Sequence, residues 1–147
     1  MRGVVMETQF RTGQSISPPE QPMGDGKTIM IVEDDVAIGS MLVEMLRQET
    51  CYRPVHVTTG EQALSAVSSV HPHLLLLDYR LPDMTGINVY TEVMNNQQAP
   101  PPAIMMSACF PTRLLATDRL TYLQKPFELD LLLEKIDQLV ESEEKKI

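Results

Sequence analysis

The sequence predicts an α/β domain in three layers, with a five-stranded parallel sheet between two layers of helices. Short apolar segments rich in β-branched residues alternate along the chain with stretches in which apolar residues recur every three or four positions. Residues 74–77 are four consecutive leucines, as expected for a strand that is buried on both faces. Strands that alternate with helices favour right-handed crossovers, and therefore a parallel sheet covered on both sides.

Each element has its own signal in the sequence. The strand pattern occurs in residues 28–33, 55–58, 74–77, 104–108 and 121–124. Amphipathic stripes predict helices that contain Ile38 to Leu46, Ala63 to Val67, Val89 to Met94 and Leu129 to Val140. Residues 112–119 offer only a short helical segment, which Pro111 limits further because proline lacks a backbone donor.

Composition restricts the class of protein. A chain of 147 residues with 43% hydrophobic side chains is expected to form one domain plus some tail. A net charge of -8 argues against a large nucleic-acid footprint, and two cysteines without a CxxC motif argue against a disulfide framework or structural zinc. Because there is no long apolar run and no apolar leader near the first residue, we expect a cytoplasmic protein that does not insert into membranes.

The chain divides into three predicted regions. Residues 1–26 are polar and rich in proline and glycine, so we expect a disordered N-terminal extension, for which Met23 is an alternative start. Residues 27–141 form the predicted domain, and residues 142–147 a charged C-terminal tail.

Polar residues follow the predicted strands at the ends where parallel strands meet one edge of the sheet. Glu33 and Asp34 lie at the end of the first strand, Asp78 at the end of the third, Ser107 at the end of the fourth and Lys125 at the end of the fifth. Ligands of open α/β sheets bind at this edge. Crowded carboxylates repel each other, and a divalent cation such as Mg²⁺ relieves that repulsion with carboxylate, water and phosphate oxygens as ligands.

A lysine and a hydroxyl can both bind phosphoryl oxygens. The set therefore describes an acidic Mg²⁺ pocket in which Asp78 can be phosphorylated. The short segments "EDD" and "KP" are commonplace individually. They indicate a site only because they occur together at the ends of the predicted strands.

Four segments in this order, "IVEDD", "LLLLDYRLPDMTG", "MMSA" and "YLQKPF", resemble the receiver domain of two-component response regulators. The resemblance implies the flavodoxin-like strand order 2-1-3-4-5. It also implies residue roles, which are the phosphoacceptor Asp78, the direct Mg²⁺ ligand Asp34, the water-mediated ligand Glu33, the backbone-carbonyl ligand Arg80, the switch hydroxyl Ser107, the switch aromatic Tyr122 and the phosphate-pairing Lys125.

Two further expectations concern this part of the chain. The resemblance implies a cis bond between Lys125 and Pro126, and Asp35 is expected to cap the first helix instead of joining the acidic pair. Ser107 and Lys125 are 18 positions apart, about one turn (~3.6 residues) fewer than in the family. We therefore expect a short or irregular fourth helix.

The expected function is a signalling switch that takes a phosphoryl group on Asp78 from a histidine kinase or histidine phosphotransfer protein. Such a domain is not an enzyme in the ordinary sense, since it catalyses only its own phosphoryl transfer and dephosphorylation. Because the last predicted helix is followed only by a charged tail, we expect its downstream target to be another protein.

Two other functions stay open. One is a receiver-like module that binds partners without being phosphorylated. The other is a Mg²⁺-dependent phosphohydrolase with an aspartyl nucleophile; haloacid-dehalogenase-like enzymes of that class place a second acid two positions later, where this chain has Arg80.

Overall fold

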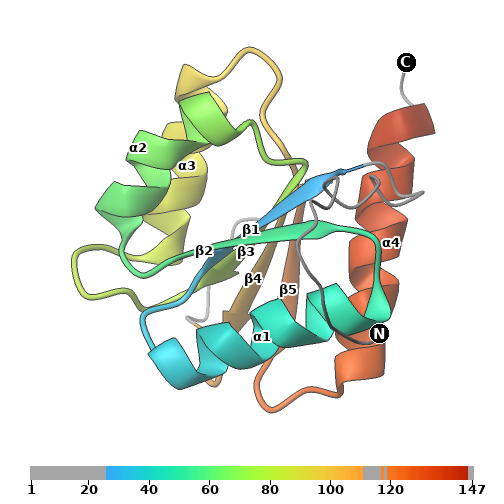
Figure 1. Ribbon diagram of the computed structural model, residues 1–147. Coiled ribbons are helices and arrows are strands. Elements are labelled where there is room, and N and C mark those ends of the chain that lie inside the picture. The colour runs from blue at the N-terminus through green and yellow to red at the C-terminus, as the bar shows by residue number, and fades with distance from the viewer. Residues whose placement is uncertain (1–25, 111–116, 118, 146–147) are drawn as a thin grey trace, which may run out of the picture.

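A parallel sheet with helices on both faces forms the protein (Figure 1). The computed structural model describes residues 26–110, 117 and 119–145. The elements in this part of the chain are β1 (Thr28–Val32), α1 (Val36–Glu49), β2 (Arg53–Val57), α2 (Gly60–Val70), β3 (Leu74–Asp78), α3 (Gly86–Asn96), β4 (Ala103–Ser107), β5 (Leu120–Gln124) and α4 (Leu129–Lys145).

The strand order is β2-β1-β3-β4-β5, and every neighbouring pair is parallel. The predicted fold class and strand order are therefore confirmed. The predicted strands agree with the observed ones to within two residues at either end.

The final helix, α4, continues to Lys145, so residues 142–145 of the predicted tail are helical. The predicted short helix over residues 112–119 lies outside the described residues except at two positions. Thr117 forms an isolated bridge with Leu120, and Arg119 lies in a turn.

Alternating side chains of the strands supply two separate apolar cores, because successive residues of a strand point to opposite faces. On one face, Ile31, Leu74 and Leu76 pack with buried residues of α1 and α4. On the other face, Leu75 and Leu77 pack with buried residues of α2 and α3. Figure 1 shows α1 and α4 on one side of the sheet and α2 and α3 on the other.

Side-chain caps begin the first three helices at the carboxyl edge of the sheet. Asp35 accepts a hydrogen bond from the Ile38 backbone N–H (3.1 Å), as the sequence predicts. Thr59 caps α2, and Thr85 caps α3 in a reciprocal capping box with Asn88. Each cap satisfies a backbone donor that the first turn of a helix leaves without an intrahelical partner.

Candidate functional site

Three carboxylates lie together at the carboxyl edge of the two central strands. Because β1 pairs with β3 in the register that sets Val32 opposite Leu77, the residues that follow, Glu33 and Asp78, are neighbours. One carboxylate oxygen each of Glu33, Asp34 and Asp78 lies within 4.8 Å of the other two. Asp34 is exposed, whereas Glu33 and Asp78 are buried, with only 1% and 8% of their surface accessible.

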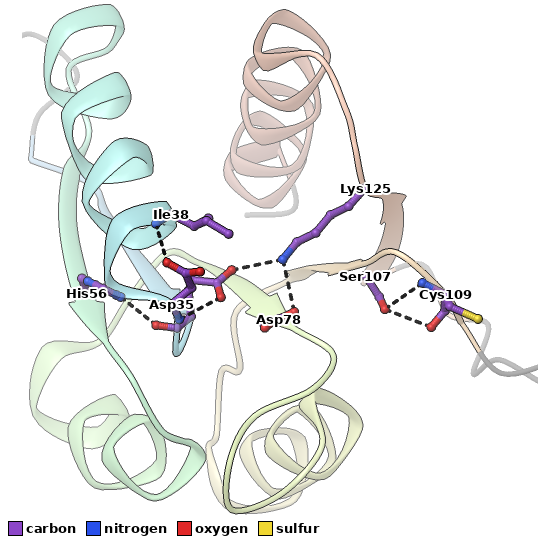
Figure 2. A network of polar contacts seen from close by, with 8 residues as sticks. Asp35, Ile38, His56, Asp78, Ser107, Cys109 and Lys125 are labelled. Carbon is purple, nitrogen blue, oxygen red and sulfur yellow. Dashed lines mark hydrogen bonds and ion pairs between the residues drawn. The ribbon is translucent and has the colours of Figure 1, made fainter.

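Lys125 brings a positive charge to this cluster from the end of β5. Its Nζ lies 3.2 Å from Glu33 Oε1 and 3.4 Å from Asp78 Oδ1, and Figure 2 shows the side chain reaching across to Asp78. The peptide bond between Lys125 and Pro126 is cis, as the resemblance implied. One ammonium thus pairs with two of the three carboxylates, and the cluster retains negative charge that a cation can neutralise.

The buried position changes the acidity of Asp78. Burial, followed by the nearby charge of Glu33, raises the pKa of Asp78 from 3.8 to about 6, although Lys125 acts in the opposite direction. Burial alone would lower the pKa of Lys125, but the carboxylates of Asp78 and Glu33 outweigh it and the pKa is raised. Near neutral pH, Asp78 is therefore an ionised carboxylate that a low-polarity environment destabilises.

Backbone contacts hold the loop after Asp78 in place. The Gly86 N–H donates to the Tyr79 carbonyl (2.7 Å), and Arg80 forms an isolated antiparallel bridge with Thr85. A Cβ on Gly86 would lie 2.6 Å from the Asp78 carbonyl oxygen, so only glycine permits this close approach. The glycine at the end of the "LPDMTG" segment thus allows α3 to begin directly beside the backbone of Asp78.

Asp83 ties the same loop to α2. Its two carboxylate oxygens accept hydrogen bonds from the backbone N–H groups of Gly60 (2.9 Å) and Glu61 (2.8 Å). These two donors are the main reason that the pKa of Asp83 is lowered. The loop that carries Arg80 is therefore anchored at the amino end of a neighbouring helix.

Ser107 ends β4 at the same edge, but its hydroxyl is engaged away from the carboxylates. The Oγ donates to the Cys109 carbonyl (2.9 Å) and accepts from the Cys109 N–H (3.1 Å), as Figure 2 shows. The side chain is buried, with 5% of the residue accessible. In this conformation the hydroxyl stabilises the turn after β4.

Tyr122 belongs to a row of three aromatic rings beside the site. Phe110 contacts Tyr122 edge to face with ring centroids 5.2 Å apart, and contacts Tyr79 in the same manner at 6.1 Å. All three side chains are partly buried against the core on the α2–α3 face. The row connects the residue after Asp78, the turn after Ser107 and the middle of β5.

The structure brings most of the sequence-predicted residues to one edge. Glu33, Asp34, Asp78 and Lys125 form one cluster, while Ser107 and Tyr122 lie beside it with other partners. Sequence reasoning did not identify Asp83, Phe110 or the contact of His56 with the Glu33 carbonyl. Asp83 lies in the "LPDMTG" part of a segment that sequence reasoning had already singled out, whereas nothing in the local sequence indicated Phe110 or the contact of His56.

The fold places this protein among the doubly wound α/β domains, whose ligands bind at the carboxyl edge of the sheet, where the acidic residues lie. Residues 29–137 match the sequence model of the response regulator receiver domain. The chain belongs to this family, the phosphorylation-dependent signalling domains of two-component systems. Within the described residues, no helix has the length and apolar character to cross a membrane.

Curated relatives match over part of their length. The DNA-binding response regulator MtrA of Mycolicibacterium paratuberculosis is 44% identical over 61 residues, which are 42% of this chain and 27% of that protein. A protein-glutamate methylesterase/protein-glutamine glutaminase of Syntrophus aciditrophicus is 31% identical over 106 residues, 67% of this chain and 30% of its own length. The chain therefore spans less than a third of these relatives.

Solved structures match over nearly their whole length. A CheY-like receiver domain protein of Methanospirillum hungatei superposes with a TM-score of 0.72 at 26% identity, covering 84% of this chain and 100% of the other. A CheY-like receiver domain of Methylobacillus flagellatus gives a TM-score of 0.69 at 22% identity, covering 78% and 99%, and shows the fold alone.

Proposed function

We propose that the protein is a signalling switch in which Asp78 accepts a phosphoryl group with the help of Mg²⁺. The observation that carries the proposal is the cluster of three carboxylates within 4.8 Å, with the Lys125 ammonium 3.4 Å from Asp78 Oδ1. The donor of the phosphoryl group is a histidine kinase or a histidine phosphotransfer protein. The protein modified is the domain itself, so its chemistry is self-phosphorylation and self-dephosphorylation.

The transfer needs a nucleophile and stabilisation of charge. An Oδ atom of ionised Asp78 forms a bond to phosphorus while the bond from phosphorus to the donor's imidazole nitrogen breaks, and the imidazole takes up a proton from solvent. Lys125, already paired with Asp78, is placed to bind a phosphoryl oxygen as negative charge shifts outward. Burial of Asp78 excludes water from the nucleophile.

The donor set fits Mg²⁺, a hard cation that prefers carboxylate, carbonyl and water oxygens. We assign Asp34 and Asp78 as direct ligands, Glu33 as a ligand through water, and the Arg80 backbone carbonyl as the remaining protein ligand. Bound by these residues, the ion would neutralise negative charge of the carboxylates and of the phosphoryl group. The anchored loop between β3 and α3 keeps the Arg80 backbone in a defined place for this role.

Ser107 and Tyr122 form the proposed switch. Reorientation of the Ser107 hydroxyl toward a phosphoryl oxygen breaks its two hydrogen bonds with Cys109. The turn that carries Phe110 then loses that support, and the ring of Tyr122 can turn inward into the vacated space. A local change in hydrogen bonding thereby alters the protein surface around Phe110 and Tyr122.

The phosphorylated surface is proposed to act on a downstream protein, in the cytoplasm. The negative net charge of the chain supports a protein target over direct contact with nucleic acid, although MtrA is described as DNA-binding. Residues 1–26 are proposed to be a dispensable extension of the domain.

The proposed function is tested by treating the protein with acetyl phosphate and Mg²⁺ and measuring intact mass. One phosphoryl group should be added to the wild-type protein and none to Asp78→Asn. Asp35→Asn is the matched control, because Asp35 lies beside the cluster and asparagine caps a helix equally well. Labelling of Asp78→Asn to the wild-type level, or labelling in excess EDTA, would refute Mg²⁺-dependent phosphorylation of Asp78. A wild-type protein that stays unlabelled with every phosphoryl donor would indicate a module that only binds partners.

A further inference from the structure

The backbone carbonyl of Glu33 receives a hydrogen bond from a side chain on a neighbouring strand. His56, half-buried on β2, places its Nε2 2.9 Å from this oxygen (Figure 2). A carbonyl oxygen has no proton to donate, so Nε2 carries the hydrogen in either charge state of the ring. The contact therefore does not depend on protonation of Nδ1.

His56 supplies this donor at the point where the backbone hydrogen bonds between β1 and β2 end. The Glu33 N–H continues the ladder by donating to the Val57 carbonyl (3.1 Å). Strand β2 ends at Val57, and the chain turns into α2 with Thr59 as its cap. His56 thus provides a donor to the Glu33 carbonyl at the point where β2 leaves the sheet.

The ring of His56 occupies space that α1 leaves open at Gly39. A Cβ on Gly39 would lie 2.1 Å from Cε1 and 2.2 Å from Nε2 of the imidazole, closer than atoms can approach. Gly39 is buried at the end of the first turn of α1, in a helical position where glycine is less favourable than alanine. The absence of a side chain at Gly39 allows the ring to lie between α1 and the end of β1, at a local cost in helix propensity.

We propose that His56 is a positioning residue for the acidic pocket and that Gly39 provides the space it needs. The inference rests on the proposed Mg²⁺ site. By holding the Glu33 carbonyl, His56 fixes the segment between β1 and α1 that presents Asp34. The same segment orients the Glu33 side chain, whose Oε2 accepts from the Asp35 N–H (3.2 Å) while Oε1 pairs with Lys125.

The test compares Mg²⁺ affinity in a set of full-length variants, by titrations followed through backbone amide NMR signals. His56→Phe keeps a ring but cannot donate, and should weaken Mg²⁺ binding about 10-fold, as loss of a group that supports metal ligands does. His56→Gln carries an amide nitrogen close to the position of Nε2 and should recover most of the affinity. His71→Gln, at an exposed histidine after α2, is the matched control and should bind as the wild type does.

Gly39 adds a second, independent arm. Gly39→Ala should weaken Mg²⁺ binding in the wild-type background because its Cβ displaces the ring. In a His56→Ala background the same change should leave Mg²⁺ affinity unaltered. In the metal-free proteins, the amide signals of Asp34 and Asp35 should shift in His56→Phe and in Gly39→Ala, but not in His71→Gln.

The outcomes separate the two proposals. Failure of the wild type to bind Mg²⁺ overturns the metal site itself, and with it this inference. Wild-type binding with unchanged affinity in His56→Phe overturns the role of His56 alone. An equal effect of Gly39→Ala in both backgrounds also overturns it, because the effect then does not act through the ring.

Discussion

Asp78→Asn should stabilise the metal-free protein at neutral pH but not in acid. The pKa of Asp78 is raised from 3.8 to about 6, chiefly by burial. Between these values the native state binds more protons than the unfolded state, so its stability falls as pH rises. A difference of roughly 2 pKa units corresponds to about 3 kcal/mol, which the ionised carboxylate costs the native state above about pH 6.

The measurement is urea unfolding in EDTA, with the wild type and the variant compared across the acid-to-neutral range. Asparagine resembles the protonated carboxyl, so the two proteins should have similar free energies of unfolding near pH 4, where Asp78 is protonated in the native state. The variant should become progressively more stable up to about pH 6 and stay so at higher pH, by up to about 3 kcal/mol. Asp35→Asn, which retains the cap, should show no such divergence.

Mg²⁺ provides the complementary arm. In millimolar Mg²⁺ the carboxylate gains a partner, so the advantage of Asp78→Asn at neutral pH should shrink or reverse. A difference between the two proteins that is the same at every pH in EDTA would refute the reasoning, because Asp78 would then titrate alike in the native and unfolded states.

Three further predictions follow from the site. Asp34→Asn should raise the metal-free free energy of unfolding by about 1 kcal/mol, because it relieves repulsion between carboxylates at an exposed position, and should abolish Mg²⁺ binding in titrations. Asp83→Ala should lower the melting temperature, since two backbone amides of α2 lose their acceptor. The difference in stability between the wild type and Asp83→Ala should be complete above the ordinary pKa of 3.8. It should disappear as pH falls through the lowered pKa of Asp83. Phe110→Ala should cost about 1 kcal/mol in urea unfolding and shift the ring signals of both Tyr79 and Tyr122 in NMR spectra.

Specific results would contradict each of these. Undiminished Mg²⁺ affinity in Asp34→Asn would remove Asp34 from the metal site. An advantage over Asp83→Ala that persists into strong acid would show that the carboxylate does not stabilise α2 by charge. Ring signals of Tyr79 that stay unchanged in Phe110→Ala would show that the aromatic row does not connect the two tyrosines.

The sequence by itself determined the fold class and the position of the acidic cluster. The four leucines of β3 and the amphipathic stripes of the helices are local patterns, and their alternation is compatible with few topologies. Parallel strands bring their carboxyl ends to one edge, so Glu33, Asp78 and Lys125 were predicted to meet although they lie far apart in the chain. The strand order and residue roles came from resemblance of four motifs to a family, not from the pattern alone.

Tertiary structure alone decided the contacts that support this cluster. The hydroxyl of Ser107 binds Cys109, the ring of His56 occupies the space above Gly39, and Phe110 lies between two tyrosines. Each of these contacts depends on a side-chain rotamer and on how separate elements pack together, and local sequence patterns specify neither. Local periodicity specifies which face of an element is buried, but the partner on that face is selected only when the elements pack together.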